Sequence, residues 1–308
     1  MADLLSLKEL LTVAQRKGFA VGAFSPRYTP LISPILRAGE ATQSPLIVQI
    51  AQVELEWYGL TLSEFARQFW SQYRRINPQV PVGLHLDHTR DLPVIEEAIA
   101  NGFTSVMIDA SALELEANIA RTRKVVALAH PHGVSVEAEL GRIGAADFIE
   151  TDRDEELYTV PEEAACFVEK TGVDALAVSV GTAHGVYTVR QPKIDLERIK
   201  AIRALTPAPL VLHGGSGTPA AMVLDAIHLP GGGISKVNIA TDLELALLAA
   251  LGRKERLTDA GLRLLPDEAL VPALGAVQQV VAEKMIHFLD SQNHAQDFSQ
   301  AGTINQYP

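Results

Sequence analysis

The chain has 308 residues, of which 47% are hydrophobic and 20% charged, so a large core is available within the length of a single α/β barrel. The net charge of −11, from 26 basic and 37 acidic residues, argues against nucleic acid or an anionic membrane as partner. One cysteine, Cys166, excludes an internal disulfide and fits a reducing cytoplasm. Residues 1–11 lack the apolar core of a signal peptide, and no apolar stretch reaches the ~18 residues of a membrane span, so we expect a cytoplasmic protein.

Short apolar runs alternate with longer helical patterns along the whole chain. The predicted strands are 20–24, 46–50, 82–86, 105–108, 134–139, 175–180, 210–213 and 235–238. The predicted helices are 31–41, 62–73, 92–101, 113–130, 161–171, 195–205, 219–228 and 242–251. Eight such units without a break in composition predict one (β/α)8 TIM barrel spanning 1–308, with a doubly wound open sheet as the alternative. Residues 270–290 predict an additional C-terminal helix, and 292–308 form a polar tail that is mobile unless a neighbouring subunit holds it.

Polar residues close six consecutive predicted strands. In chain order they are Asp87 with His88, Asp109, Glu139, His184, His213 and Asn238. Because chemistry in these barrels takes place at the carboxyl ends of the strands, we expect these side chains to converge on one mouth.

Three of these residues are histidines, the type of ligand that suits a divalent metal and zinc above all, although Co²⁺ and Mn²⁺ stay open. A neighbouring carboxylate, that of Asp87, can move protons beside such a metal. His85 points to the same face of its strand as Asp87, and either supports the site or packs in the core. The remaining histidines lie in helices, turns or the tail and are assigned no role; they are His130, His132, His228, His287 and His294.

Glycines follow the proposed ligands. Gly185 comes directly after one histidine, and Gly214 and Gly215 directly after another. Glycine lets backbone amides approach a ligand closely, and such barrels commonly bind phosphate with the loops after strands seven and eight. Here those loops are 214–216 and 238–241, the second of which enters a helix whose N-terminus favours an anion. The sequence thus predicts a phosphate cradle beside the metal.

With these residues in place, the chain resembles the class II, metal-dependent ketose-bisphosphate aldolases, which include fructose- and tagatose-bisphosphate enzymes. The resemblance covers residues 5 to 285. It is carried by GAF at 22–24, SPLIVQ at 44–49, HLDH at 85–88, GFTSVMID at 102–109, VSVEAELG at 134–141, GTAHGVY at 181–187, LHGGSG at 212–217 and KVNIAT at 236–241.

The resemblance implies a role for each site residue. Asp87 would be the acid/base acting on the C4 oxygen of the substrate. Zn²⁺ would be held by His88, His184 and His213, whereas Asp109 and Glu139 match positions of a second or alternative metal, either divalent or monovalent. The cradle for dihydroxyacetone phosphate would comprise Gly185, Gly214, Gly215, Ser216, Asn238, Ile239, Ala240 and Thr241, and the substrate-site Gln49 is retained.

The implied reaction cleaves or forms the C3–C4 bond of a phosphorylated ketose through a zinc-stabilised enediolate. It needs no Schiff base, so Lys236 is assigned to packing or to phosphate binding. The small Ala240, where fructose-type enzymes usually have Asp, favours tagatose-like stereochemistry or another stereochemistry again. The resemblance also implies a homodimer or homotetramer that acts on a small phosphorylated sugar.

Departures from the family pattern gather on the acceptor side. Ser25 replaces the usual Asn, Ala51 a Ser and Thr89 a Gly. The usual mobile loop with its Glu is replaced by 144–148, and the substitute for that Glu is Asp147 in this segment, Glu150 just after it, or none. We therefore expect an acceptor aldehyde other than glyceraldehyde 3-phosphate. Three arginines near strand ends are candidates to bind an acidic group on it: Arg27, Arg90 and Arg142.

Two other functions stay open. One is a non-catalytic, aldolase-like subunit that stabilises another aldolase, although a scaffold has no need for an intact set of metal ligands. The other is a different reaction through an enediolate in the same metal site, such as epimerisation or decarboxylation.

Overall fold

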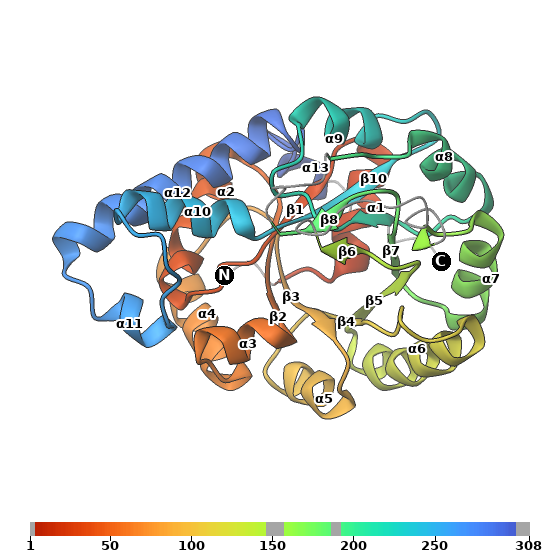
Figure 1. Cartoon of the computed structure of the whole chain (residues 1–308), viewed down its shortest axis with the longest axis horizontal. Coiled ribbons are helices and arrows are strands. Elements are labelled where there is room, and N and C mark those ends of the chain that lie inside the picture. The colour runs from red at the N-terminus through yellow and green to blue at the C-terminus, as the bar shows by residue number, and fades with distance from the viewer. Residues whose placement is uncertain (1–3, 146–156, 186–191, 300–308) are drawn as a thin grey trace.

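The computed structural model describes residues 4–145, 157–185 and 192–299. Eight parallel strands close into a barrel in the order β1-β10-β9-β7-β5-β4-β3-β2, with helices around the outside (Figure 1). This confirms the predicted (β/α)8 TIM barrel and excludes the doubly wound sheet. The barrel strands are β1 Val21–Phe24, β2 Leu46–Ala51, β3 Val82–Thr89, β4 Ser105–Ile108, β5 Ser135–Leu140, β7 Ala175–Val178, β9 Leu210–Leu212 and β10 Ile234–Ile239. Two short strands, β6 Gly144–Ala145 and β8 Ala183–His184, pair with each other beyond the barrel ends.

Helices follow the strands at the predicted places. They are α2 Ile32–Thr42, α4 Leu62–Ile76, α5 Leu92–Ala100, α6 Leu115–Ala129, α7 Pro161–Thr171, α8 Leu196–Leu205, α9 Ala220–Ile227 and α10 Thr241–Ala250. A further short helix, α3 Gln52–Tyr58, lies between β2 and α4, and two single 3-10 turns, Thr29–Leu31 and His130–His132, precede α2 and follow α6. The apolar faces of the helices bury the outward side chains of the strands, and this packing forms the main core.

The interior of the barrel holds an apolar set and a polar set of side chains. The apolar set comprises Val21, Ala23, Ile47, Met107, Ala175, Ala177 and Val211. The buried polar and charged set comprises Gln49, His85, Asp87, Glu137, Glu139, His213 and Lys236. The strand period of two sends alternate residues inward, so β5 places Glu137 and Glu139 inside and packs Val136 and Ala138 against the helices.

Helix α1 (Leu7–Lys17), which the sequence analysis did not predict, closes the amino-terminal end of the barrel. It begins at a capping box in which the Ser6 hydroxyl accepts from the Glu9 N–H and the Glu9 carboxylate accepts from the Ser6 N–H. Its leucines, Leu7, Leu10 and Leu11, are fully buried against the barrel interior. The capping box and this spacing are the signals by which α1 could have been found.

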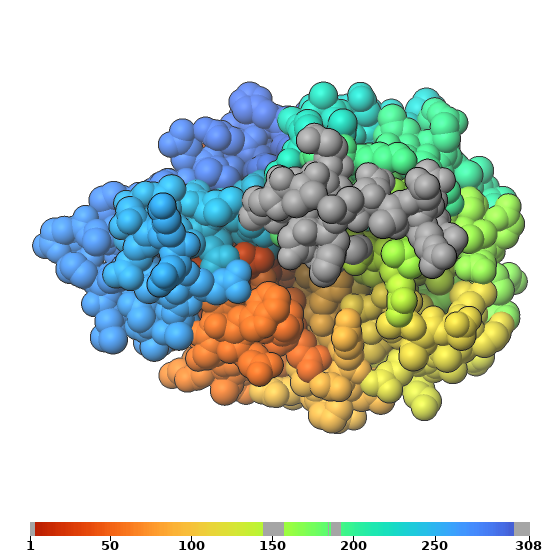
Figure 2. Space-filling view, in the orientation of Figure 1, coloured from red at the N-terminus to blue at the C-terminus, as the bar shows by residue number. Residues whose placement is uncertain are grey.

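The predicted C-terminal helix is present as α12 (Asp267–His287), which packs on α2 and α10 and forms, with α10 and the short α11 (Asp259–Arg263), an extension at one end of the molecule (Figures 1 and 2). Among the described residues α12 is the one helix long and apolar enough to cross a membrane by length and composition. This corrects the expectation that no stretch reaches that length. A single such helix is a weak indication of a span.

The first part of the C-terminal tail packs on its own chain. The Asn293 N–H donates to the Thr42 carbonyl at 3.0 Å, and the His294 ring stacks on Phe19 with centroids 4.1 Å apart. A short helix, α13 (Gln296–Ser299), follows, in which Asp297 pairs with Lys17 at 2.7 Å. Residues 292–299 are thus held without a second subunit; residues 300–308 lie outside the described part of the chain.

Candidate metal-dependent active site

The end of β3 is irregular, and this irregularity sets the geometry of the site. The pairing of β3 with β4 shifts register between Leu86 and Thr89, and His88 adopts a left-handed backbone with φ of 38°. In a regular strand Asp87 and His88 would point to opposite faces. The bulge and the positive φ bring both side chains to the mouth of the barrel, at the cost of local backbone strain.

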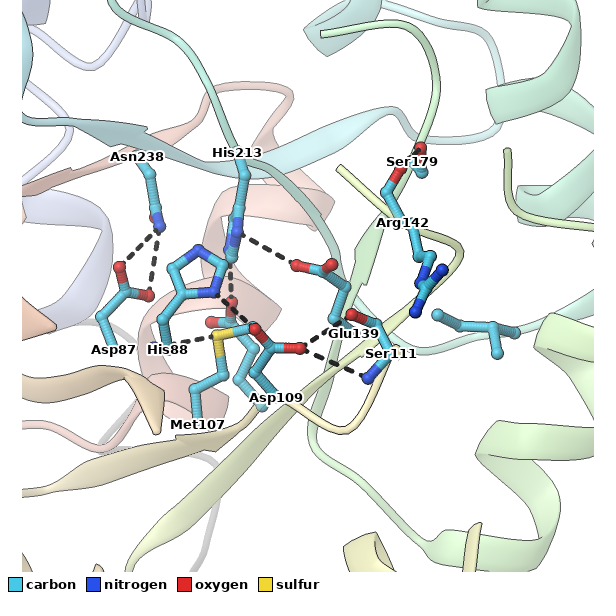
Figure 3. A network of polar contacts seen from close by, with 12 residues as sticks. Asp87, His88, Met107, Asp109, Ser111, Glu139, Arg142, Ser179, His213 and Asn238 are labelled. Carbon is cyan, nitrogen blue, oxygen red and sulfur yellow. Dashed lines mark hydrogen bonds and ion pairs between the residues drawn. The ribbon is translucent and has the colours of Figure 1, made fainter. Parts of the chain in front are cut away.

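The Asp87 carboxylate is buried and held from two sides. The Asn238 side-chain amide, from β10, donates to both of its oxygens at 3.2 Å, and the Gln49 amide, from β2, donates to Oδ2 at 3.1 Å. Two amides therefore fix the direction of its lone pairs. Figure 3 shows the two contacts from Asn238.

His88 and His213 face each other beside this carboxylate, with ring centroids 4.5 Å apart. The ligand atoms of Asp87, His88 and His213 lie within 4.8 Å of one another. Two further carboxylates approach the rings: Asp109 Oδ2 lies 3.3 Å from His88 Nδ1, and Glu139 Oε2 lies 3.5 Å from His213 Nδ1 (Figure 3). The fold thus brings five of the predicted residues into one centre.

This donor set fits a divalent cation. It combines two imidazoles with three carboxylates, and the buried Oε2 of Glu139 has no hydrogen-bond partner among the described residues. His184 belongs to β8, whose pairing with β6 aligns it with Ala145 after β5. The side chain of His184, like Asp147 and Glu150, lies outside what the structure describes.

The charges of the centre are strongly coupled. Burial lowers the pKa of His88, but Asp87 and Asp109 outweigh it and raise that pKa to about 10. Burial raises the pKa of Asp87, yet His88 and His85 hold it well below its usual range. Burial also raises the pKa of Glu139, to about 8, and lowers that of His213, where the positive His88 adds to the effect. In the metal-free protein a carboxylate base therefore lies next to a cationic imidazole.

The predicted phosphate cradle consists of the loops 214–216 and 238–241, which the Ser216 hydroxyl connects through hydrogen bonds. The Ser216 hydroxyl accepts from the N–H groups of Ala240 and Asp242, each at 3.2 Å, and so joins the loop after β9 to the start of α10. At Gly214, where φ is 71°, a Cβ would lie 2.3 Å from the Ala183 carbonyl oxygen, so only glycine fits.

The centre opens into a cavity of about 880 Å³. Among the predicted site residues, its lining includes Gln49, Asp87, His88, Asp109, Glu139, Gly185, Gly214, Ser216, Asn238, Ala240 and Thr241. Three others lie behind this wall. His213 is fully buried, Gly215 donates its N–H to the Asn238 carbonyl, and the Ile239 side chain packs in the core while its carbonyl accepts from the Ser25 N–H.

Comparisons with known proteins identify the family of this chain. The family model described as class II fructose-bisphosphate aldolase matches residues 5–294. The chain belongs to this family. It is 38% identical over 302 residues to a fructose-bisphosphate aldolase of Thermus caldophilus, covering 90% of this chain and 95% of the relative. The crystal structure of the YdjI aldolase of Escherichia coli K12 superposes with a TM-score of 0.80 at 32% identity, covering 95% of this chain and 100% of that one. The protein is accordingly a class II aldolase, a carbon–carbon lyase.

Within this aldolase the three candidate arginines differ. Arg27, at φ of 61°, is buried and already paired: its Nε donates to Glu54 at 2.8 Å and its Nη1 to Glu244 at 2.6 Å. Glu244 also accepts from the hydroxyls of Tyr28 and Tyr58. The predicted use of Arg27 for an acidic group of the acceptor is therefore not supported, because its guanidinium is bound to two carboxylates.

The other two arginines lie at the open side of the cavity, against one segment after β4. Arg90 Nη2 lies 3.8 Å from Asp109 Oδ2, and Arg142 Nη2 donates to the Ala112 carbonyl at 3.2 Å. Both line the cavity, which also has apolar walls from Val53 and Trp57. The guanidinium groups of these two arginines are exposed at the solvent side of the cavity.

The sequence leaves Lys236 open between packing and phosphate binding and assigns no role to Glu137. Lys236 is fully buried and its Nζ lies 2.8 Å from Glu137 Oε2, so it does not reach a phosphate. Burial raises the pKa of Glu137, but Lys236 and His213 lower it to about 2. The alternation of Glu137 with Glu139 on β5 was the signal that two carboxylates enter the barrel.

Proposed function

We propose that this class II aldolase cleaves and forms the C3–C4 bond of a phosphorylated ketose, with dihydroxyacetone phosphate as donor and with Zn²⁺ as its metal. His88, His184 and His213 would hold the zinc, and Asp109 and Glu139 would serve a second or alternative cation position. When bound, the ion would supply Lewis-acid stabilisation of the negative charge that develops on the donor's oxygens. The observation that carries the proposal is the Asp87 carboxylate, fixed by two amides beside two imidazoles.

The position of each residue in the cavity indicates its role in the reaction. Asp87, ionised and aimed by Asn238 and Gln49, accepts the proton of the C4 hydroxyl in cleavage and returns it to the aldehyde oxygen in condensation. The donor phosphate would bind between the loops 214–216 and 238–241 at the start of α10, which the Ser216 hydroxyl holds together. The small Ala240 in this cradle leans toward tagatose-like stereochemistry.

The acceptor is an aldehyde other than glyceraldehyde 3-phosphate. Ala51 and Val53 form an apolar wall near the mouth, and Arg90 and Arg142 offer cationic groups against the loop after β4. A guanidinium binds carboxylate or phosphate with two parallel hydrogen bonds. An aldehyde with an acidic substituent fits this side of the cavity.

The decisive experiment is proton exchange of dihydroxyacetone phosphate in D₂O, followed by NMR, with zinc-loaded enzyme and a chelated control. Metal-dependent, stereospecific loss of one C3 proton supports the donor half without knowledge of the aldehyde. If no exchange occurs with zinc bound, cleavage assays on ketose 1-phosphates and bisphosphates decide between a different donor and slow exchange. No cleavage of any of them overturns the proposal.

We also propose a homo-oligomer in the cytoplasm, a dimer or tetramer. Large apolar side chains are exposed on the α10–α12 extension: Leu245 is 48%, Leu264 85% and Val271 62% exposed. Exposed apolar side chains on one part of the molecule make that part the candidate for a protein–protein contact. A monomer by light scattering at micromolar concentration would refute the oligomer.

A further inference from the structure

A second layer of ionisable side chains lies one step deeper in the barrel than the proposed metal centre. His85, Glu137 and Lys236 each precede a residue of the mouth by two positions, namely Asp87, Glu139 and Asn238. Since alternate residues of a barrel strand point inward, these side chains stack in layers. All three of the deeper ones are fully buried.

Glu137 connects the two layers. Its Oε1 lies 3.0 Å from His213 Nε2, and its Oε2 lies 2.8 Å from Lys236 Nζ. A neutral imidazole carries one N–H, and the contact with a carboxylate places it on Nε2, so Nδ1 presents its lone pair on the side of Glu139. A carboxylate behind a metal-binding imidazole fixes its tautomer and orientation in this way.

Two residues of the deeper layer, together with Asp87 of the mouth, form a group able to hold a cation. The ligand atoms of His85, Asp87 and Glu137 lie within 4.8 Å of one another, and all three residues are buried. His85 Nε2 has no hydrogen-bond partner among the described residues, while lying 3.7 Å from Asp87 Oδ1 and 3.6 Å from Glu137 Oε2. The ammonium of Lys236 supplies the positive charge that this group otherwise lacks, and it repels a second cation.

We propose that Lys236 is a positioning residue, which holds Glu137 so that Glu137 orients His213 toward the metal centre. The charge of Lys236 also prevents a divalent cation from binding to the group formed by His85, Asp87 and Glu137. This inference rests on the proposed metal centre. Lys236 thereby keeps Asp87 free for proton transfer, because an ion bound in the deeper layer would take that carboxylate as a ligand.

The test measures zinc in the whole protein. Wild type, Lys236→Met and Glu137→Gln/Lys236→Met are stripped with a chelator and reloaded, the bound zinc is counted by elemental analysis, and affinity is measured by competition with a chromophoric chelator. Lys254→Met, at an exposed lysine, is the matched control. The double variant removes both buried charges together, which proteins tolerate better than removal of one.

Lys236→Met is expected to bind one more zinc than wild type. The double variant is expected to keep the wild-type number, since the amide that replaces the Glu137 carboxylate is a poor zinc ligand. It is also expected to bind zinc about tenfold or more weakly, because His213 loses its carboxylate. A folded Lys236→Met with the wild-type zinc count overturns the guarding role, and wild-type affinity in the double variant overturns the positioning role. A wild type that binds no zinc overturns the proposed metal centre instead, so the two failures are distinguishable.

Discussion

Asn238 and Asp87, 151 residues apart along the chain, meet across the mouth of the barrel, where the amide of Asn238 donates to both carboxylate oxygens at 3.2 Å. An amide that spans both oxygens leaves the carboxylate little rotational freedom. Asp87 is therefore oriented before any substrate binds. An acid/base group needs such a fixed orientation because it must accept the proton at one defined position.

Replacing Asp87 by Asn or Ala should abolish most turnover and retain the metal. The loss of an acid/base group typically lowers kcat by about 10²–10⁴-fold. The test distinguishes an acid/base role from a metal-ligand role, because the ligand atoms of Asp87, His88 and His213 lie within 4.8 Å of one another. Steady-state cleavage and zinc content are measured together, with Asp91→Asn at the cavity rim as control. Loss of zinc along with turnover would assign Asp87 to the metal instead.

Replacing His184 or His213 by Ala should remove both zinc and activity, since a site of three imidazoles loses a strong ligand in each case. Elemental analysis after gel filtration and the cleavage assay measure the two losses. His228→Ala, an exposed histidine paired with Asp290, should change neither. Full zinc occupancy in His184→Ala would place the third ligand elsewhere.

Zinc affinity of the chelated protein should rise with pH. The pKa of His88 is raised to about 10 by Asp87 and Asp109 against the effect of burial, so His88 is protonated at neutral pH in the metal-free protein. Zinc must displace this proton, so affinity increases about tenfold per pH unit below that value. Competition titrations from about pH 6 to about pH 9 in two buffers, with proton release by calorimetry, check the sign. An affinity independent of pH would mean that His88 is not a ligand.

Replacing Arg27 by Met should destabilise the protein. Removing one partner of a buried ion pair costs about 3–5 kcal/mol. We expect the lower end of that range, because Arg256 still contacts Glu244 and Ser25 still donates to Glu54. Urea unfolding measures the change, with the exposed Arg253→Met as control. A change below about 0.5 kcal/mol, the size typical of a surface substitution, would show that the network contributes little to stability.

Much of the site was predictable because its signals are local. The end of β3 carries the HLDH run, and the position of a residue at a strand end is enough to place it at the mouth of a barrel. The partners of single charges were not predictable. The sequence makes Arg27 a candidate to bind an acidic group and leaves Lys236 between packing and phosphate binding. Each is paired with a carboxylate far away in sequence, Glu244 and Glu137.

The sequence by itself determined the barrel, since hydrophobic periodicity and the order of eight units follow from burial along each segment. It also indicated Asp87, His88, Asp109, Glu139 and Asn238 as residues of the mouth. Only the tertiary structure decided how they act on one another: that Asp87 is aimed by Asn238, that Lys236 neutralises Glu137, and that α1 seals the opposite end. Periodicity reports the face on which a side chain lies, whereas pairing depends on distances of a few ångströms between segments that only the closed barrel brings together.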